Sequence, residues 1–235
     1  MTNVGEFKIR KVRKLSAEVQ AADALRDGIL SGEIPPGARL TEIRMAEQLG
    51  VSRATIRTAF HQLTQEGLID QIPYTGWSVM SLSAHDAWEL YTLRSSFEAL
   101  GSKLVAMRIK AAGPHGAESA RLNSVLAALK AACDSGDRKA IAAADFSLHR
   151  AIIDLAGHRR LAEQYGEVEQ QIRIYIASSD SLVAEPEAIL KQHIPIIEAL
   201  KAGDVELSVR TAIEHNEQEG AKLEAHLRQA EASAG

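Results

Sequence analysis

Residues Leu40–Leu68 read LTEIRMAEQLGVSRATIRTAFHQLTQEGL, and they split at Gly50 into two short amphipathic segments. The apolar residues of the first segment are Ile43, Met45, Ala46 and Leu49. Those of the second follow the i, i+3, i+4, i+7 spacing of a helix: Ile56, Ala59, Phe60 and Leu63. Two helices joined by a short turn that contains glycine form a helix-turn-helix.

Capping signals support two separate helices. Thr41 can cap the first helix, Gly50 is placed to end it, and Ser52 can cap the second. The second helix has no carboxylate between Ser52 and Gln65, and its polar face carries Ser52, Arg53, Thr55, Arg57 and His61. Arginine can fork onto guanine in a major groove, and hydroxyls can bind phosphate. The alternative is an ordinary solvated helix pair.

The sequence after Gly67 predicts a β-hairpin. Two short strand-like runs, residues 68–72 and 77–80, flank the turn Pro73–Gly76. A hairpin directly after a recognition helix is a wing. Upstream, Ile34–Leu40 contains two prolines and a glycine, which predicts a rigid turn leading into the motif.

These motifs together resemble the winged helix-turn-helix of the GntR family of bacterial transcription regulators, over about residues 15–80. The matching segments are Gly32–Leu40, Gly50–Arg53 with Arg57, and Glu66–Leu68 with Gly76. The resemblance implies DNA contacts from Arg39, Ser52, Arg53, Thr55 and Arg57, with Gly76 at the wing tip near the minor groove.

One position departs from the family pattern. Many members carry arginine directly after the glutamate that matches Glu42, and that arginine often contacts DNA. This chain has Ile43 there and Arg44 one place further on. One helical step turns a side chain by about 100°, so whether Arg44 replaces the missing arginine stays open.

Composition fits a globular protein of one large domain or two. The chain is 46% hydrophobic and 25% charged, with a net charge of −4. Residues 1–82 carry 10 Lys and Arg against 9 Asp and Glu, and the remainder carries 17 against 22. This asymmetry agrees with DNA binding by the front half.

Three observations bear on the location of the protein. The single cysteine, Cys133, cannot form an internal disulfide, which fits a reducing cytoplasm. No apolar run approaches the roughly 18 residues of a membrane span, and the N-terminus lacks a signal-peptide core. We therefore expect a cytoplasmic protein with no membrane partner.

Two segments precede the motif. Residues 8–14 contain five basic residues, which suits either an arm that touches phosphates or a disordered basic tail. From Ser16 onward, apolar spacing predicts a helix that ends at Gly32 and packs behind the helix-turn-helix.

Beyond the wing, the pattern changes to successive amphipathic helices. We expect helices near residues 84–111, 116–134, 137–156, 159–180, 186–202 and 204–230. The predicted fold is therefore mainly α, with a winged helix-turn-helix over residues 1–82 and an all-α bundle over residues 83–235.

The bundle contains a candidate metal-binding set. Asp145 and His149 lie four apart and project from one helix face, and His193 and His215 follow on two later helices. Imidazole nitrogens and a carboxylate suit Zn²⁺, Ni²⁺ or Mn²⁺, and bundles build metal sites from facing helices. Spacing alone leaves open a plain Asp–His pair and isolated, solvated histidines.

The same residues resemble the FCD effector domain of FadR-type GntR regulators, over about residues 85–225. The resemblance rests on Asp145-x-x-x-His149, Gln192-His193, Glu198-Ala199-Leu200, Gly203-Asp204 and His215. It implies a divalent metal, zinc first and nickel or manganese as alternatives, held by Asp145, His149, His193 and His215 at the floor of an effector cavity. Leu148 and His158 depart from the family pattern without removing a ligand.

Arg94 and Arg173 are candidate effector contacts. Arg94 lies on a helix apolar enough to enclose it partly, where a guanidinium can fork onto an effector carboxylate. The alternative is an i, i+4 ion pair with Glu98. Arg173 is the weaker candidate.

The resulting hypothesis is a homodimeric transcription repressor that binds a pseudo-palindromic double-stranded operator and a small carboxylate effector. A metal-dependent enzyme is the rival, but we find no Glu-His or Ser-His arrangement beside the ligands to supply a general base. A metal-stapled protein-interaction module is the other alternative. Both rivals leave the DNA-binding half unexplained.

Overall fold

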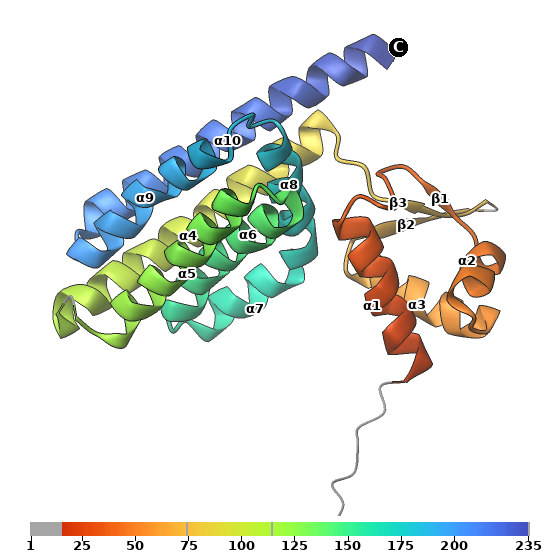
Figure 1. The fold of residues 1–235 in the computed structure, drawn as a ribbon, viewed down its shortest axis with the longest axis horizontal. Coiled ribbons are helices and arrows are strands. Elements are labelled where there is room, and N and C mark those ends of the chain that lie inside the picture. Colours follow the sequence, from red (N-terminus) through yellow and green to blue (C-terminus); the bar gives the residue numbers. More distant parts are fainter. Residues whose placement is uncertain (1–15, 74, 114, 235) are drawn as a thin grey trace, which may run out of the picture.

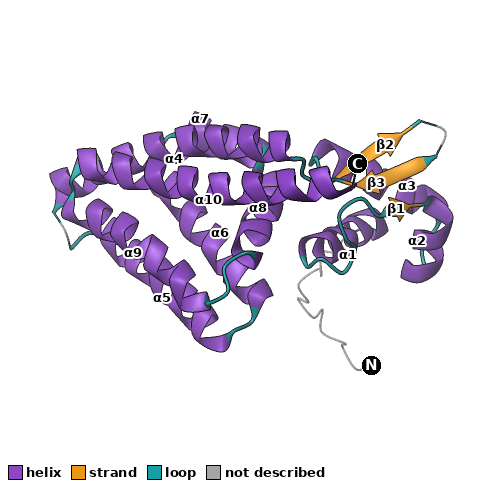
Figure 2. Cartoon of the chain, turned by 90° about the horizontal axis from the view of Figure 1, so that it is seen from above, coloured by secondary structure: helices purple, strands orange, loops and turns teal. Residues whose placement is uncertain are grey.

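The computed structural model describes residues 16–73, 75–113 and 115–234 (Figure 1). The basic segment 8–14 lies outside the described residues. A winged helix-turn-helix with a small sheet is followed by a bundle of helices, as Figure 2 shows from above. The mainly α fold predicted from the sequence is confirmed.

The winged part follows the predicted order of elements. These are α1 (Ala17–Leu30), β1 (Arg39–Leu40), α2 (Glu42–Leu49), α3 (Arg53–Gln65), β2 (Ile69–Ile72) and β3 (Gly76–Val79). The sheet is antiparallel in the order β1-β3-β2, and Leu40 pairs with Trp77. Gly50 ends α2 with a φ of 65°, and Ser52 caps α3 by accepting the Thr55 amide at 3.1 Å. The sequence-level capping signals are thus confirmed.

The core of the winged part comes mainly from α3. Its apolar face is fully buried, and the Phe60 ring packs in a tilted arrangement against Trp77 of the wing, with 4.8 Å between the ring centroids. The expectation for α2 is wrong in part, since Ile43 is 54% exposed and Leu49 is also exposed. This helix is only eight residues long, and it turns just Met45 and Ala46 inward.

The bundle contains the remaining helices. They are α4 (Ala84–Ala112), α5 (Ala117–Ser135), α6 (Arg138–Leu155), α7 (Arg159–Glu167), α8 (Glu169–Ser181), α9 (Pro186–Ala202) and α10 (Val205–Ala234). One prediction is wrong, because the expected helix 159–180 is two helices. Val168 leaves the helical conformation with φ −110° and ψ 7°, and its amide bonds back to Tyr165. The chain changes direction there.

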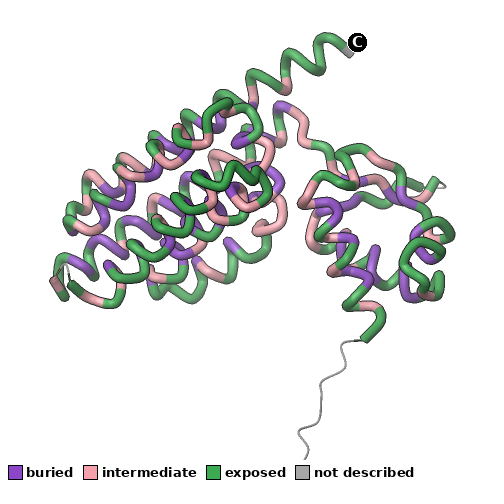
Figure 3. Tube along the Cα trace, viewed as in Figure 1, coloured by how far each residue is buried: buried purple, intermediate pink, exposed green. Residues whose placement is uncertain are grey.

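Helices α4 and α10 run antiparallel side by side along the bundle (Figure 1). Buried residues follow the inward faces of the helices, whereas the outward faces are exposed (Figure 3). No helix among the described residues has the length and apolarity that crossing a membrane requires.

Two hydrophobic clusters fill the winged part and the bundle, and Leu82 packs against both of them. Ile174 on α8 belongs to the cluster of the winged part. Helix α8 is therefore an element of the bundle that also packs against the winged part. The boundary at residue 82 agrees with this division but stays a prediction.

Candidate nucleic-acid interface and metal centre

The exposed face of α3 presents two arginines one turn apart, Arg53 and Arg57. Arg57 donates from Nε to Glu42 Oε1 at 2.7 Å and from Nη2 to Glu42 Oε2 at 2.8 Å. Arg53 Nη2 lies 3.8 Å from the same carboxylate. The hydrogen bonds from Arg57 lower the pKa of Glu42, whereas burial raises it. The hydrogen bonds have the larger effect, so the pKa lies below its usual value. Helix α2 thus holds an arginine of α3 in a defined position.

Ser52 and Thr55 lie at the start of α3 and differ in exposure. Ser52 is exposed, whereas Thr55 is buried, and their hydroxyl oxygens are 2.9 Å apart. The N-terminus of a helix presents free amides that suit phosphate. In this geometry Ser52 faces outward and Thr55 supports it from behind.

The other predicted DNA contacts surround this helix. Arg39 on β1 is exposed, as are Ile43 and Arg44 on the outer side of α2. Gly76 begins β3 with a φ of 115°, and a Cβ there would lie 3.0 Å from the Leu40 carbonyl oxygen. Only glycine allows β3 to approach β1 so closely at that point. The DNA contacts themselves stay predictions.

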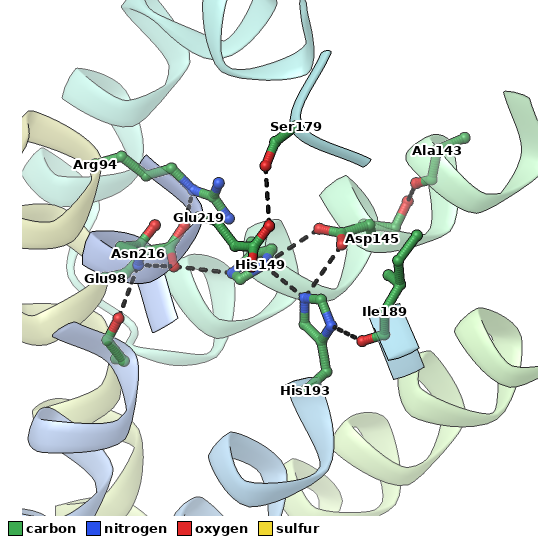
Figure 4. A network of polar contacts seen from close by, with 12 residues as sticks. Arg94, Glu98, Ala143, Asp145, His149, Ser179, Ile189, His193, Asn216 and Glu219 are labelled. Carbon is green, nitrogen blue, oxygen red and sulfur yellow. Dashed lines mark hydrogen bonds and ion pairs between the residues drawn. The ribbon is translucent and has the colours of Figure 1, made fainter. Parts of the chain in front are cut away.

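In the bundle, His149, His193 and His215 come together from α6, α9 and α10. One ring nitrogen from each lies within 4.8 Å of the others, and all three residues are buried. His149 Nε2 and His193 Nε2 are 3.0 Å apart (Figure 4). The Asp145 carboxylate lies 3.2 Å from each of these two nitrogens, one oxygen to each. The four residues singled out in the sequence therefore meet at one point.

Outer partners fix the orientation of two rings. His193 Nδ1 donates to the Ile189 carbonyl at 2.7 Å, and His149 Nδ1 donates to Glu98 Oε2 at 2.8 Å. In neutral histidine only one ring nitrogen carries hydrogen, so both Nε2 atoms then point unprotonated lone pairs at each other and at Asp145. Such an arrangement favours a proton or a metal ion between these atoms. The donor set fits a divalent metal ion, whose histidine ligands commonly donate their other N–H in this way.

When no metal is bound, a proton on His193 can stabilise the same group of side chains. Burial lowers the pKa of His193, but the charge of Asp145 outweighs burial and raises that pKa to about 9. Burial and the neighbouring His193 and His149 keep the pKa of His215 well below its usual range. Asp145 is ionised, because both histidines overcome the effect of burial on its pKa. One proton or one metal ion can therefore satisfy the cluster.

Glu98 on α4 is the residue that sequence reasoning undervalued. It is buried, and it accepts hydrogen bonds from Arg94 Nε at 2.7 Å, His149, Asn216 Nδ2 at 2.9 Å and the Tyr165 hydroxyl at 3.3 Å. Burial raises the pKa of Glu98, but the charges of Arg94 and His149 together have a larger effect and lower it below its usual value. Glu98 is therefore ionised. The i, i+4 spacing to Arg94 indicated one of these bonds, whereas nothing in the spacing indicated that Glu98 orients a candidate metal ligand.

Arg94 forms the predicted ion pair with Glu98 and still has an unused donor. It is 3% exposed, and its Nη2 has no hydrogen-bond partner among the described residues. The Tyr175 hydroxyl, Asp180 Oδ2 and Asn216 Oδ1 are also buried without a partner in the described chain. Arg94 Cζ is 5.7 Å from the Tyr175 ring centroid. Buried polar atoms are normally satisfied by protein, water or ligand, so water or a ligand belongs beside them.

Arg173 lies elsewhere. Its guanidinium is 3.7 Å from the Phe146 ring centroid and pairs with Glu169 at 3.0 Å. It lines a groove of about 320 Å³ between the bundle and α1, together with Asp27 and Lys139. Among the described residues, Arg173 does not contact the histidine cluster. Its role in effector binding stays a prediction.

Comparison with known proteins covers both parts of the chain. Residues 17–79 match the family described as "Bacterial regulatory proteins, gntR family", and residues 89–218 match the "FCD domain". A "Probable D-xylose utilization operon transcriptional repressor" of Paenarthrobacter nicotinovorans is 27% identical over 206 residues, 88% of each chain.

Two further relatives agree. An "Uncharacterized HTH-type transcriptional regulator in the TAR-I ttuE-ttuC' intergenic region" of Agrobacterium vitis is 32% identical over 157 residues, 66% of this chain and 88% of that one. A crystal structure titled as a putative GntR transcriptional regulator from Rhodococcus sp. RHA1 superposes with a TM-score of 0.74 and 26% identity, covering 88% of this chain and 96% of that one. These families and relatives are transcription regulators and not enzymes, as predicted.

Proposed function

Because the chain belongs to the GntR family of bacterial DNA-binding transcription regulators, with an FCD domain, we propose that it is a repressor that senses a small carboxylate metabolite at a divalent metal ion. The relative from Paenarthrobacter nicotinovorans is named as a repressor. Such a regulator acts on DNA in the bacterial cytoplasm.

The convergence of two histidine Nε2 atoms on Asp145 carries this proposal. His149 Nε2 and His193 Nε2 lie 3.0 Å apart, both beside the Asp145 carboxylate. Asp145, His149, His193 and His215 would hold the ion, and Zn²⁺ accepts this donor set best, with Ni²⁺ and Mn²⁺ as alternatives. When bound, the metal supplies a Lewis-acidic position that a carboxylate oxygen can take.

The free donor of Arg94 supports the carboxylate. Arg94 Nη2 and the Tyr175 hydroxyl are buried without partners in the described chain, and both can donate to an anionic oxygen. Glu98 fixes Arg94 through Nε, so the guanidinium is already oriented. In the proposed complex the chain holds a small acid with a sugar-acid, hydroxy-acid or dicarboxylate structure.

Helix α8 offers a route from this site to the DNA-binding half. Tyr175 and Asp180 lie on α8, and Ile174 on the same helix packs into the core of the winged part. A ligand that binds better to one position of α8 shifts the population toward that position. The spacing of two winged parts, and with it DNA affinity, then changes with effector concentration.

DNA binding is proposed to use Arg39, Ser52, Arg53 and Arg57, with Gly76 near the wing tip and Thr55 behind Ser52. Two copies reading a pseudo-palindrome would each contribute one α3. Exposed Leu93, Leu100 and Met107 repeat every seven residues along α4, which is the spacing of a seam between two helices. We therefore place the partner copy of the homodimer against α4.

A ligand screen tests the sensing proposal. Metal-loaded and metal-free protein are compared by thermal shift with a panel of small carboxylates and their uncharged amides. We expect at least one carboxylate, and not its amide, to raise the unfolding temperature of the metal-loaded protein. The Arg94→Lys variant, checked for folding by circular dichroism, should lose that shift. Equal shifts with and without metal would contradict the proposal.

A further inference from the structure

The ion pair between Glu42 and Arg57 joins the first residue of α2 to the recognition helix. Both Glu42 oxygens accept from Arg57, at 2.7 and 2.8 Å. The Glu42 side chain is only 12% exposed, whereas that of Arg57 is 55% exposed. The largely enclosed carboxylate of Glu42 therefore binds one edge of the Arg57 guanidinium, and the rest of the guanidinium is exposed to solvent.

The ion pair with Glu42 leaves several N–H donors of Arg57 unused. A guanidinium has five N–H groups in a fixed fork. Glu42 takes the Nε hydrogen and one hydrogen of Nη2. Both hydrogens of Nη1 and the second hydrogen of Nη2 remain, and one hydrogen from each of these two nitrogens forms the end-on edge of the fork. That edge can still donate to guanine O6 and N7 in the major groove.

Arg57 is the arginine of this face that is held in this way. Arg53 approaches Glu42 only to 3.8 Å. Arg39 and Arg44 are exposed, and their side chains make no ion pair with the described residues. Free arginines of this kind can move to whichever phosphate is near, whereas Arg57 is oriented before DNA arrives.

We infer that Glu42 is a positioning residue that determines which base Arg57 reads. The inference rests on the proposed contact of Arg57 with DNA. On the operator, Arg57 keeps its bond to Glu42 and donates its end-on edge to a guanine. To bind a phosphate on non-specific DNA through its Nε and Nη2 edge instead, Arg57 must leave Glu42, and the carboxylate is then unpaired beside the phosphate backbone. Glu42 thus favours the operator by penalising the alternative.

In vitro selection from a randomised DNA duplex pool tests this inference without knowledge of the operator. The full-length protein, Glu42→Gln, Arg57→Ala and the control Glu47→Gln are each used to select duplexes, and affinities are then measured for the wild-type consensus and for a scrambled duplex. Glu47 is exposed on the same helix and makes no ion pair with described residues, so its variant removes an equal charge without touching Arg57.

We expect Glu42→Gln and Arg57→Ala to lose preference at the same base pair of each half-site. Glu42→Gln should lower the ratio of consensus to scrambled affinity by about 10-fold, and Glu47→Gln should leave the consensus and the ratio unchanged. Glu42→Asp keeps the charge but shortens the side chain, so it should also lose that preference. Thermal unfolding shows that each variant is folded.

Two outcomes would overturn the inference. If Arg57→Ala changes the consensus and Glu42→Gln does not, Glu42 only fastens α2 to α3, while the DNA contact of Arg57 stands. If neither variant changes the consensus, Arg57 reads no base, and both the inference and that part of the proposed function fail.

Discussion

The winged part and the bundle use the same pairing of arginine with glutamate in opposite surroundings. The Arg57 side chain is 55% exposed beside Glu42, and that of Arg94 is 3% exposed beside Glu98. Water and salt screen the first pair, so it contributes little to stability. The second pair is enclosed in the bundle, where removing one partner leaves a buried charge uncompensated.

This difference separates two kinds of functional residue. On α3, charges remain available to a partner, and substituting them should alter binding while the fold persists. Around the histidine cluster, charges satisfy one another, and substituting them should alter the fold and the site together.

The largest effect should follow the loss of the buried carboxylate. Glu98→Gln removes the charge that Arg94, His149, Asn216 and Tyr165 share. We expect the free energy of unfolding, measured by urea titration, to fall by about 3–5 kcal/mol. Glu89→Gln changes an exposed glutamate of the same helix and should shift it by less than about 0.5 kcal/mol. Equal effects would show that Glu98 is not buried in a charged network.

Metal affinity should depend on pH because a proton and a metal compete for the cluster. The pKa of His193 is raised to about 9, so below that pH a metal ion must displace the proton. The dissociation constant for Zn²⁺, measured by competition with a chelating dye, should fall about tenfold for each pH unit between about pH 6 and 8. A pH-independent constant would remove His193 from the ligand set.

The same proton stabilises the metal-free fold. Unfolded histidine titrates near pH 6.5, so the stabilisation is fully present below about pH 6.5 and is lost as pH rises toward 9. Urea titration of metal-free protein should therefore show lower stability at about pH 9 than at pH 6.5. The His193→Ala variant should show a smaller decrease.

Arg57→Ala should lower operator affinity without lowering stability. Arg57 is exposed, and losing a base-reading arginine typically weakens binding by about 5- to 100-fold. Gel-shift titration against the selected consensus measures the loss, and thermal unfolding should be unchanged. A variant that binds as tightly as the parent would end the contact role of Arg57.

Thr55→Val should have the smallest effect on DNA binding. Thr55 is buried and its hydroxyl lies 2.9 Å from that of Ser52, so we expect operator affinity to change by less than about twofold, with a modest loss of stability from the hydrogen bond. A much larger loss of affinity in a gel shift would show that Thr55 itself reaches DNA.

Sequence patterns predicted the features that depend on neighbouring residues. The cap at Ser52, the left-handed Gly50 and the apolar face of α3 all follow from local spacing, and the structure contains them. Asp145 and His149 share a face because they are four residues apart. Their meeting with His193 and His215 came from the family resemblance, since spacing left other arrangements open.

Features that depend on tertiary packing could not be predicted in this way. The break at Val168 separates two helical segments without a glycine or proline between them, so no local signal indicates the boundary. Ile43 is apolar but exposed, because α2 packs against its neighbours only through the face that carries Met45 and Ala46. Glu98 and Asn216 meet His149 from helices far apart in the chain, and no local pattern indicates such contacts.

The central claim is that the histidine cluster holds one divalent metal ion per chain. Elemental analysis of the untagged protein, beside the Asp145→Ala/His149→Ala double variant, tests it most directly. His226→Ala, which alters an exposed histidine on α10, is the matched control. We expect about one metal ion per chain in the parent and in the control, and none in the double variant. A folded parent that holds no metal after dialysis against Zn²⁺, Ni²⁺ and Mn²⁺ would contradict the claim.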